Sequence, residues 1–165
     1  MMSPRDKGFT FIELLVVLGV LAILFATGYN TYRKARFRAE VRSGLATLAT
    51  TLREARSSSQ RFNVTARVQF ATPRRFTLLA KNRLGQVHRN YSRELSPVLE
   101  IQYSKDGVHW QSADALSSVT YKAPFGETNA SSTLLRVQHT GEPGIAACLR
   151  IIGVTGRVVV ARACP

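Results

Sequence analysis

The fold of this chain is decided near its start, by the stretch Lys7-Gly8-Phe9-Thr10-Phe11-Ile12-Glu13-Leu14-Leu15-Val16-Val17. The apolar run that begins there continues to Ala26, and Glu13 is the acidic residue within it. The stretch from Phe9 to Tyr29 is long enough for a helix that crosses a bilayer, which takes about 20 residues. A carboxylate inside such a helix is costly unless it finds a partner, so we interpret Glu13 as functional. The alternative is an ordinary signal anchor that tolerates a Glu near its polar end.

The same stretch, Lys7 to Val17, resembles the class III signal of type IV pilins and type II secretion pseudopilins. In that family a prepilin peptidase in the membrane cuts after the glycine, and the new N-terminal phenylalanine is N-methylated. The resemblance therefore implies cleavage between Gly8 and Phe9, which makes Glu13 the fifth residue of the mature chain. An ordinary secretory signal is cut after its apolar region, whereas here the small residue precedes that region.

The spacing of Phe9 and Glu13 suits assembly chemistry. Cleavage leaves a free amine on Phe9, and residues four apart lie on the same face of a helix. In apolar surroundings an isolated ammonium and an isolated carboxylate each need a counter-charge. The resemblance implies that Glu13 of one subunit meets the amine of Phe9 of its neighbour in a fibre.

The charges that flank the apolar run conflict with export. Arg5 and Lys7 precede the run, and five cations follow it: Arg33, Lys34, Arg36, Arg38 and Arg42. The positive-inside rule would place the C-terminal side in the cytoplasm. The exported family that the leader resembles and the pair of cysteines favour the opposite orientation. We therefore expect a single-pass protein of the bacterial inner membrane whose head lies in the periplasm and which enters a pilus or pseudopilus.

A second helical pattern follows the apolar run without an intervening proline. Val41, Leu45, Leu48 and Leu52 recur at spacings of one helix face. This predicts one long helix from Phe9 to Ser59, apolar all round in its first half and amphipathic in its second. The expected organisation is a leader at 1–8, a transmembrane and assembly helix at 9–30, an amphipathic helix at 31–59 and a globular, β-rich head at 60–165.

Alternating apolar residues then predict strands. The pattern runs from Phe62 to Phe70, and Asp106-Gly107 marks a hairpin between Leu99–Tyr103 and a strand through Val108 and Trp110. Further strands are expected at Arg75–Ala80, Val119–Lys122, Thr133–His139, Ala146–Ile152 and Arg157–Ala163, and loops at Gln86–Pro97 and Gly126–Ser132. The fold class is α+β: a long N-terminal α-helix packed on a small antiparallel β-sheet head, as in pilins.

Cys148 and Cys164 lie close together in the sequence, as expected of a disulfide formed in an oxidising compartment. A simple hairpin centred between Val154 and Thr155 puts Cys148 opposite Ala161. Cys164 must therefore curl back, or a bulge must shift the register, before the sulfurs can meet. The alternative is two buried or reactive thiols, and two cysteines alone make a metal site unexpected.

The formal net charge of +13 suggests an anionic partner. The ending from Cys148 to Val159 resembles the C-terminal hairpin of the GspH/FimT branch of pseudopilins and minor pilins, in which a Gly-Arg-any-Arg tail is implicated in DNA uptake. Here Gly156-Arg157 is followed by Val158 and Val159, so the second arginine of that tail is absent. The candidate DNA-binding residues are Arg150, Arg157, Arg162, Arg74 and Arg75; the alternatives are a solvated surface and binding to acidic lipid headgroups.

These observations predict a structural subunit, a minor pseudopilin or minor pilin of a type II secretion pseudopilus or a type IV pilus. Its expected partners are other pilins through the N-terminal helix, the prepilin peptidase and the inner membrane, with secretion cargo and DNA as further candidates. A DNA-binding minor pilin for natural transformation is the alternative, and a membrane-tethered enzyme is a third hypothesis. No enzyme activity, cofactor or metal is expected, because His88, His109 and His139 are isolated in the sequence.

Overall fold

The computed structural model of the chain describes residues 10–161 and residue 164, apart from the side chains of residues 26 and 27. The chain divides into two compact units, of which the first ends at Arg36 and the second begins at Phe37. Helix α1, Phe11–Phe62, contributes residues to both units. The boundary between the units falls inside the segment 31–59 that the sequence assigns to the amphipathic helix.

Helix α1 is continuous, and it extends three residues beyond the predicted end at Ser59. The serine run does not break it, because the Ser59 hydroxyl donates to the carbonyl of Arg56 at 2.8 Å and stays compatible with helical backbone. The helix stops where Asn63 takes a left-handed conformation with φ of 52°, a common way for a helix to end. Phe62 therefore belongs to the helix, and the prediction that it starts a strand is wrong.

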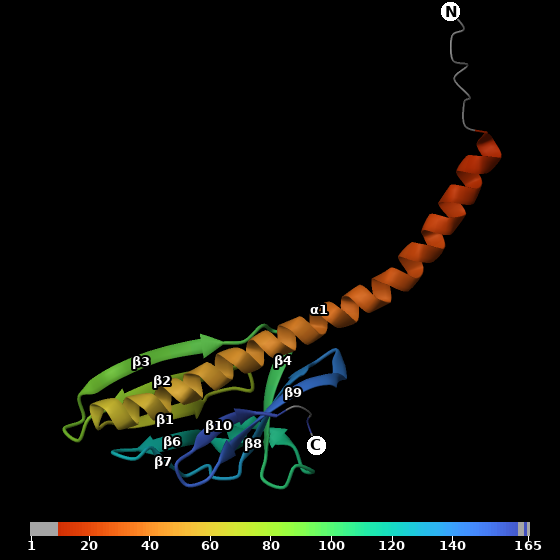
Figure 1. Cartoon of the computed structure of the whole chain (residues 1–165). Coiled ribbons are helices and arrows are strands. Elements are labelled where there is room, and N and C mark those ends of the chain that lie inside the picture. The colour runs from red at the N-terminus through yellow and green to blue at the C-terminus, as the bar shows by residue number, and fades with distance from the viewer. Residues whose placement is uncertain (1–9, 162–163, 165) are drawn as a thin grey trace, which may run out of the picture. The chain divides into compact units, whose positions relative to one another are not determined.

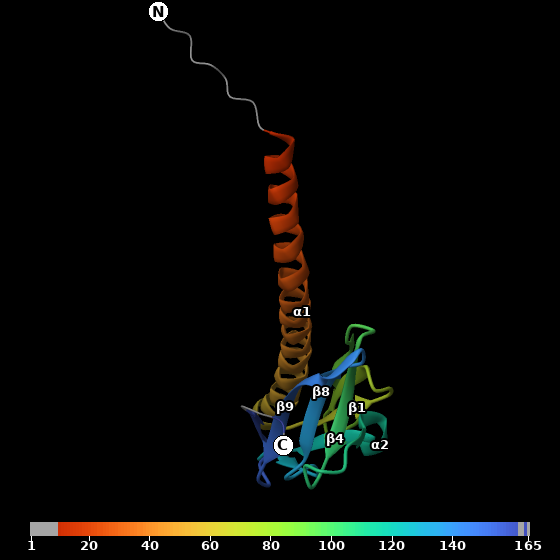
Figure 2. The same ribbon diagram turned by 90° about the vertical axis from the view of Figure 1, so that its right-hand side faces the viewer.

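The rest of the second unit, the head, contains ten strands and one short helix among the described residues. The strands are β1 (Thr65–Phe70), β2 (Arg75–Lys81), β3 (Val87–Glu94), β4 (Leu99–Ser104), β5 (Gln111–Ser112), β6 (Ser118–Lys122), β7 (Glu127–Thr128), β8 (Leu134–His139), β9 (Glu142–Ile152) and β10 (Arg157–Val160), and the helix is α2 (Ala113–Leu116). They form two five-stranded sheets, ordered β3-β2-β1-β6-β7 and β10-β9-β8-β4-β5 (Figure 1). Each pair of neighbouring strands is antiparallel, and β4, β8 and β9 lie side by side in Figure 2. The expected α+β class is confirmed, with two sheets in place of one.

Two predicted loops contain strands. The segment 86–97 holds β3, which pairs with β2 along its length, and the segment 126–132 holds the short β7. In contrast, Val108 and Trp110 lie in the loop between β4 and β5, so the predicted hairpin has a longer connection and a shorter second strand. The side chain of Trp110 instead covers the guanidinium of Arg136, at 4.2 Å from the ring centroid.

The core of the head forms between α1 and the inner faces of the sheets. The predicted stripe Val41, Leu45, Leu48 and Leu52 is at most 4% exposed. Alternate residues of the strands meet it, such as Val68 on β1, Leu78 on β2, Ile101 on β4 and Leu149 on β9. Each fully buried Leu or Val contributes about 1.5–3 kcal/mol relative to an exposed position, so this half of α1 is an integral part of the folded head.

Candidate functional site

The start of α1 is closed by a reciprocal pair of hydrogen bonds between Thr10 and Glu13. The Glu13 carboxylate accepts from the backbone N–H of Thr10 at 3.2 Å and from its hydroxyl at 3.1 Å. The Glu13 N–H in turn donates to the Thr10 hydroxyl oxygen at 3.4 Å. This is a capping box, and the Thr-x-x-Glu spacing that signals it is present in the sequence. The local capping role of Glu13 was not predicted from the sequence, although this spacing is a signal that could have found it.

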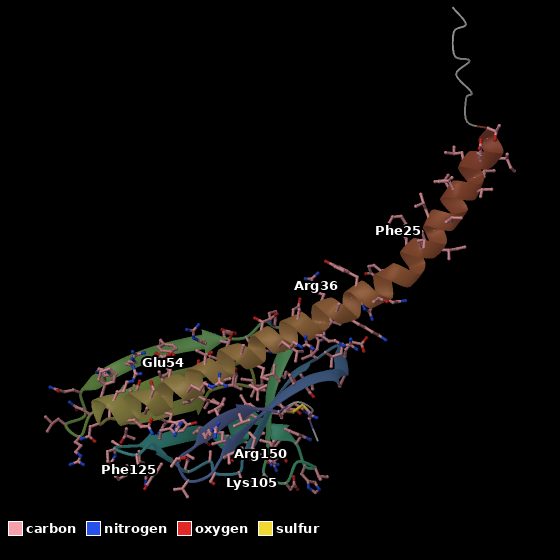
Figure 3. All side chains as sticks on the ribbon, in the orientation of Figure 1. Phe25, Arg36, Glu54, Lys105, Phe125 and Arg150 are labelled. Carbon is pink, nitrogen blue, oxygen red and sulfur yellow. A yellow bond between two sulfur atoms is a disulfide. The ribbon has the colours of Figure 1, made fainter. Side chains whose placement is uncertain are left out.

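No other described part of the chain covers the apolar part of α1. The helix contains an 18-residue window with a mean hydropathy of 2.5, none of it buried, which is long and apolar enough to cross a membrane. Large apolar side chains from Phe11 to Phe25 are exposed around the helix (Figure 3). Gly19 and Gly28 have no atom within 4 Å of an added Cβ, so neither glycine is required by contacts within the described chain. Exposed apolar surface on this scale marks a site of interaction with a membrane or with protein.

The two predicted processing residues, Gly8 and Phe9, lie outside the described residues. Their roles in cleavage and methylation therefore stay predictions. The described structure begins at Thr10, so the part of the predicted assembly site that it shows is the Thr10–Glu13 cap and the apolar helix after it.

The amphipathic half of α1 also carries a polar contact to the head. The Glu54 carboxylate accepts a hydrogen bond from the Tyr91 hydroxyl at 2.5 Å and forms an ion pair with Arg89. Tyr91 and Arg89 both lie on β3, and Glu54 is labelled on α1 in Figure 3. Strand β3 was not predicted from the sequence because it has few apolar residues to pack on the core. The contact with Glu54 helps to hold it against α1 instead.

The C-terminal hairpin carries the predicted disulfide. Arg157 lies opposite Ile152, and the Ala161 N–H donates to the carbonyl of Cys148 at 2.9 Å, so the ladder keeps the expected register. Cys164 is bonded to the buried Cys148, with 5.3 Å between the Cα atoms. The β9–β10 register is unshifted as far as Val160, so no bulge between those strands brings the two cysteines together.

The candidate DNA-binding arginines separate into two groups. Arg150 and Arg157 share the outer face of the hairpin, because Arg157 lies opposite Ile152, two residues after Arg150. Both are exposed, and Arg150 shares a hollow of about 240 Å³ with Lys105, which lies close to it in Figure 3. Arg162 lies outside the described residues.

Arg75 is the first residue of β2 in the other sheet, Arg74 directly precedes it, and both already have acidic partners. Arg75 forms an ion pair with Glu94 at 2.7 Å, and Arg74 lies 3.7 Å from Glu100. The four of these arginines that the structure describes are therefore not gathered into one cationic site.

Polar clusters elsewhere in the head have structural roles. In the β4–β5 loop the Asp106 carboxylate accepts hydrogen bonds from the N–H groups of Val108 and His109 and contacts the His109 ring at 2.5 Å. The bond to the His109 ring is the largest of the causes that hold the pKa of Asp106 well below its usual range. His139 is buried at the end of β8, where it stacks on Phe37 and its Nδ1 accepts from the Gly141 N–H. Within the described residues no group of three metal-ligating side chains is found.

The comparisons with known proteins agree with this geometry. The family described as "Prokaryotic N-terminal methylation motif" matches residues 3–29. The type IV minor pilin FimU of Pseudomonas aeruginosa is similar in structure, with a TM-score of 0.56 and 14% identity over 78% of this chain and 97% of FimU. The minor pseudopilin EpsH of the Vibrio cholerae type II secretion system is similar too, with a TM-score of 0.57 and 15% identity over 74% of this chain and 94% of EpsH. No match is found among curated proteins.

At these identities the two structures show the fold alone. The family model identifies an N-terminal methylation motif at residues 3–29. The motif covers the apolar start of α1, and the fold covers the head that follows. The chain therefore joins a match to the N-terminal methylation motif at residues 3–29 to a fold similar to those of the minor pilin FimU and the minor pseudopilin EpsH.

Proposed function

We propose that the chain is a minor pilin or minor pseudopilin, a non-enzymatic subunit that joins an envelope fibre through its N-terminal helix. The observation that carries this proposal is the uncovered apolar part of α1 with a single carboxylate, Glu13, at its start. Other pilin-type helices are the partner that satisfies both features, because they supply apolar surface and a terminal amine. The head then lies outside the membrane, where it contacts neighbouring subunits or secretion cargo.

In this proposal Glu13 has two states. In the single chain its carboxylate caps Thr10. In the fibre the amine that cleavage leaves on Phe9 of a neighbouring subunit pairs with the same carboxylate. An ion pair in apolar surroundings is favourable only when both members are present, which makes it a device for correct assembly.

Substitution of Glu13 by Gln and by Val separates the two states. Glutamine keeps the capping box but removes the charge, whereas valine removes both. We expect both variants to insert into the membrane and to be cleaved, and neither to enter the fibre fraction of sheared cells. Normal incorporation of Glu13→Gln would contradict the charge-pairing role and leave only the cap.

Processing and orientation complete the proposal. We infer that a prepilin peptidase cuts after Gly8, that Phe9 is methylated, and that the head faces the periplasm. The disulfide between Cys148 and Cys164 supports this orientation, because such bonds persist in oxidising compartments. Intact precursor in envelopes from cells with an active peptidase would contradict the cleavage site.

DNA capture is a second candidate, favoured by the position of Arg150 and Arg157 on one face of the hairpin. Phosphate contacts by a few arginines give binding that is independent of sequence and falls steeply with salt. If this face captures DNA, the double substitution Arg150→Ala and Arg157→Ala abolishes a mobility shift at low salt, whereas Arg74→Ala, at a position that has an acidic partner, leaves it. Absence of any shift with the unaltered chain at low salt would remove this candidate.

A further inference from the structure

The end of the head at which α1 finishes is built by three turns that surround the last residues of the helix. The turns are residues 82–86 between β2 and β3, 123–126 between β6 and β7, and 153–156 between β9 and β10. The Phe62 ring lies 4.2 Å from the ring of His88, and the Gln60 amide donates to the carbonyl of Phe125 at 3.1 Å. The third turn joins them, because the Thr128 N–H donates to the carbonyl of Val154 at 2.8 Å. We call this the helix-end surface.

Large apolar side chains are concentrated on the helix-end surface. Their exposed fractions are 48% for Phe62, 84% for Leu84, 55% for Val87, 68% for Phe125 and 65% for Val154. Phe125 is labelled at this end of the head in Figure 3. Turns that face only water favour Gly, Asn, Asp and Ser, so five exposed apolar side chains on and beside three turns indicate a surface that is covered in use.

The charges on this surface are mainly positive. Arg61, Arg83 and Arg157 are exposed beside the apolar side chains, and no ion pair joins them to another described residue. Glu127 is an acidic residue at the same end, and it lies opposite Lys122 in the β6–β7 ladder. An apolar centre with a cationic rim is complementary to an apolar centre with an acidic rim.

We propose that the helix-end surface docks the head of a different pilin-type subunit, whose facing surface carries apolar side chains and carboxylates. A second copy of this chain fits poorly, because a formal net charge of +13 on each copy would bring like charges together. Nucleic acid would leave the aliphatic side chains of Leu84, Val87 and Val154 without matching partners. This inference rests on the proposed function, since a fibre is what brings heads of different subunits together.

The test places a photo-crosslinking amino acid at Leu84 in the full chain in its native envelope. Two further positions serve as references: Ala115 on α2, which is exposed away from these turns, and Leu18 on the apolar helix. The cross-linked peptides are identified by mass spectrometry. Charge reversal by Arg61→Glu and by Arg83→Glu, each made singly, is compared with Arg67→Glu, a matched single change at an exposed position on β1.

The expected result is a Leu84 adduct with a protein that carries the N-terminal methylation motif, joined through a peptide that contains Asp or Glu. Charge reversal should lower its yield by about tenfold or more, whereas Arg67→Glu should leave it nearly unchanged. An adduct with a second copy, with lipid, with nuclease-sensitive material or with a protein lacking the motif would overturn the inference, as would a yield no greater than that at Ala115. If Leu18 still cross-links to pilin-type helices in those cases, the proposed function stands and only this docking surface is refuted; loss of the Leu18 adduct as well refutes both.

Discussion

Loss of the bridge between Cys148 and Cys164 is expected to lower the free energy of unfolding of the head by about 3 kcal/mol. The bridge closes a loop with a sequence separation of 16, and most of its effect comes from the restriction of the unfolded chain. The folded hairpin does not need it, because the β9–β10 pairing already extends to the bond between Ala161 and Cys148. For a head of this size the midpoint of thermal unfolding should fall by roughly 10 °C.

Urea denaturation of the full chain in detergent, with and without reductant, measures this difference directly. Reduction isolates the bridge, since it changes no side-chain volume. The pair Cys148→Ala and Cys164→Ser serves as a second route, with alanine at the buried position to avoid an unpaired hydroxyl there. Near-ultraviolet circular dichroism should show the same folded state. A decrease in the free energy of unfolding below about 1 kcal/mol would refute this reasoning, because it would mean that the bridge adds little restriction to the unfolded chain.

Two further predictions test local structure. Gly156→Ala should lower the free energy of unfolding by about 2–5 kcal/mol, since Gly156 has φ of 63° and a Cβ there would lie 2.5 Å from the Tyr121 ring. Gly153→Ala should lower it by only about 1–2 kcal/mol, since Gly153 has φ of 68° but no atom within 4 Å of an added Cβ. Equal losses in urea denaturation would contradict the contact with Tyr121. The depressed pKa of Asp106 means that its contribution to stability is present above the ordinary value of 3.8 and is lost only as the pH falls well below it. A carboxyl NMR titration should therefore show Asp106 still ionised at pH 3.8, and half-protonation at that pH would contradict the hydrogen bonds to His109.

The long helix could be predicted from the sequence because its signals are local. The stripe from Val41 to Leu52 has the helical period, and no proline interrupts it. The C-terminal hairpin could be predicted in the same way, since the position of its turn places Ala161 opposite Cys148. These features depend on residues that are near one another in the chain.

The errors arose where partners distant in the sequence decide the structure. Strand β3 has mainly polar residues on both faces, so its sequence lacks the alternation that predicts a strand. It forms because β2 pairs with it and because Glu54 binds Tyr91 and Arg89. The two sheets depend on the pairing of β1 with β6 and of β4 with β8, which no local pattern specifies. The Asp106-Gly107 signal indicated a turn but not its length, because the packing of Trp110 on Arg136 lengthens the connection.

The participation of α1 in both the apolar N-terminal segment and the core of the head has a mechanical consequence. Leu48 and Leu52 belong to the same uninterrupted helix as the apolar residues near Glu13. A pull along the part of α1 within the head therefore acts directly on residues of the hydrophobic core. Release of the head from this part of the helix would expose Leu48 and Leu52, so the two should separate only when the core unfolds.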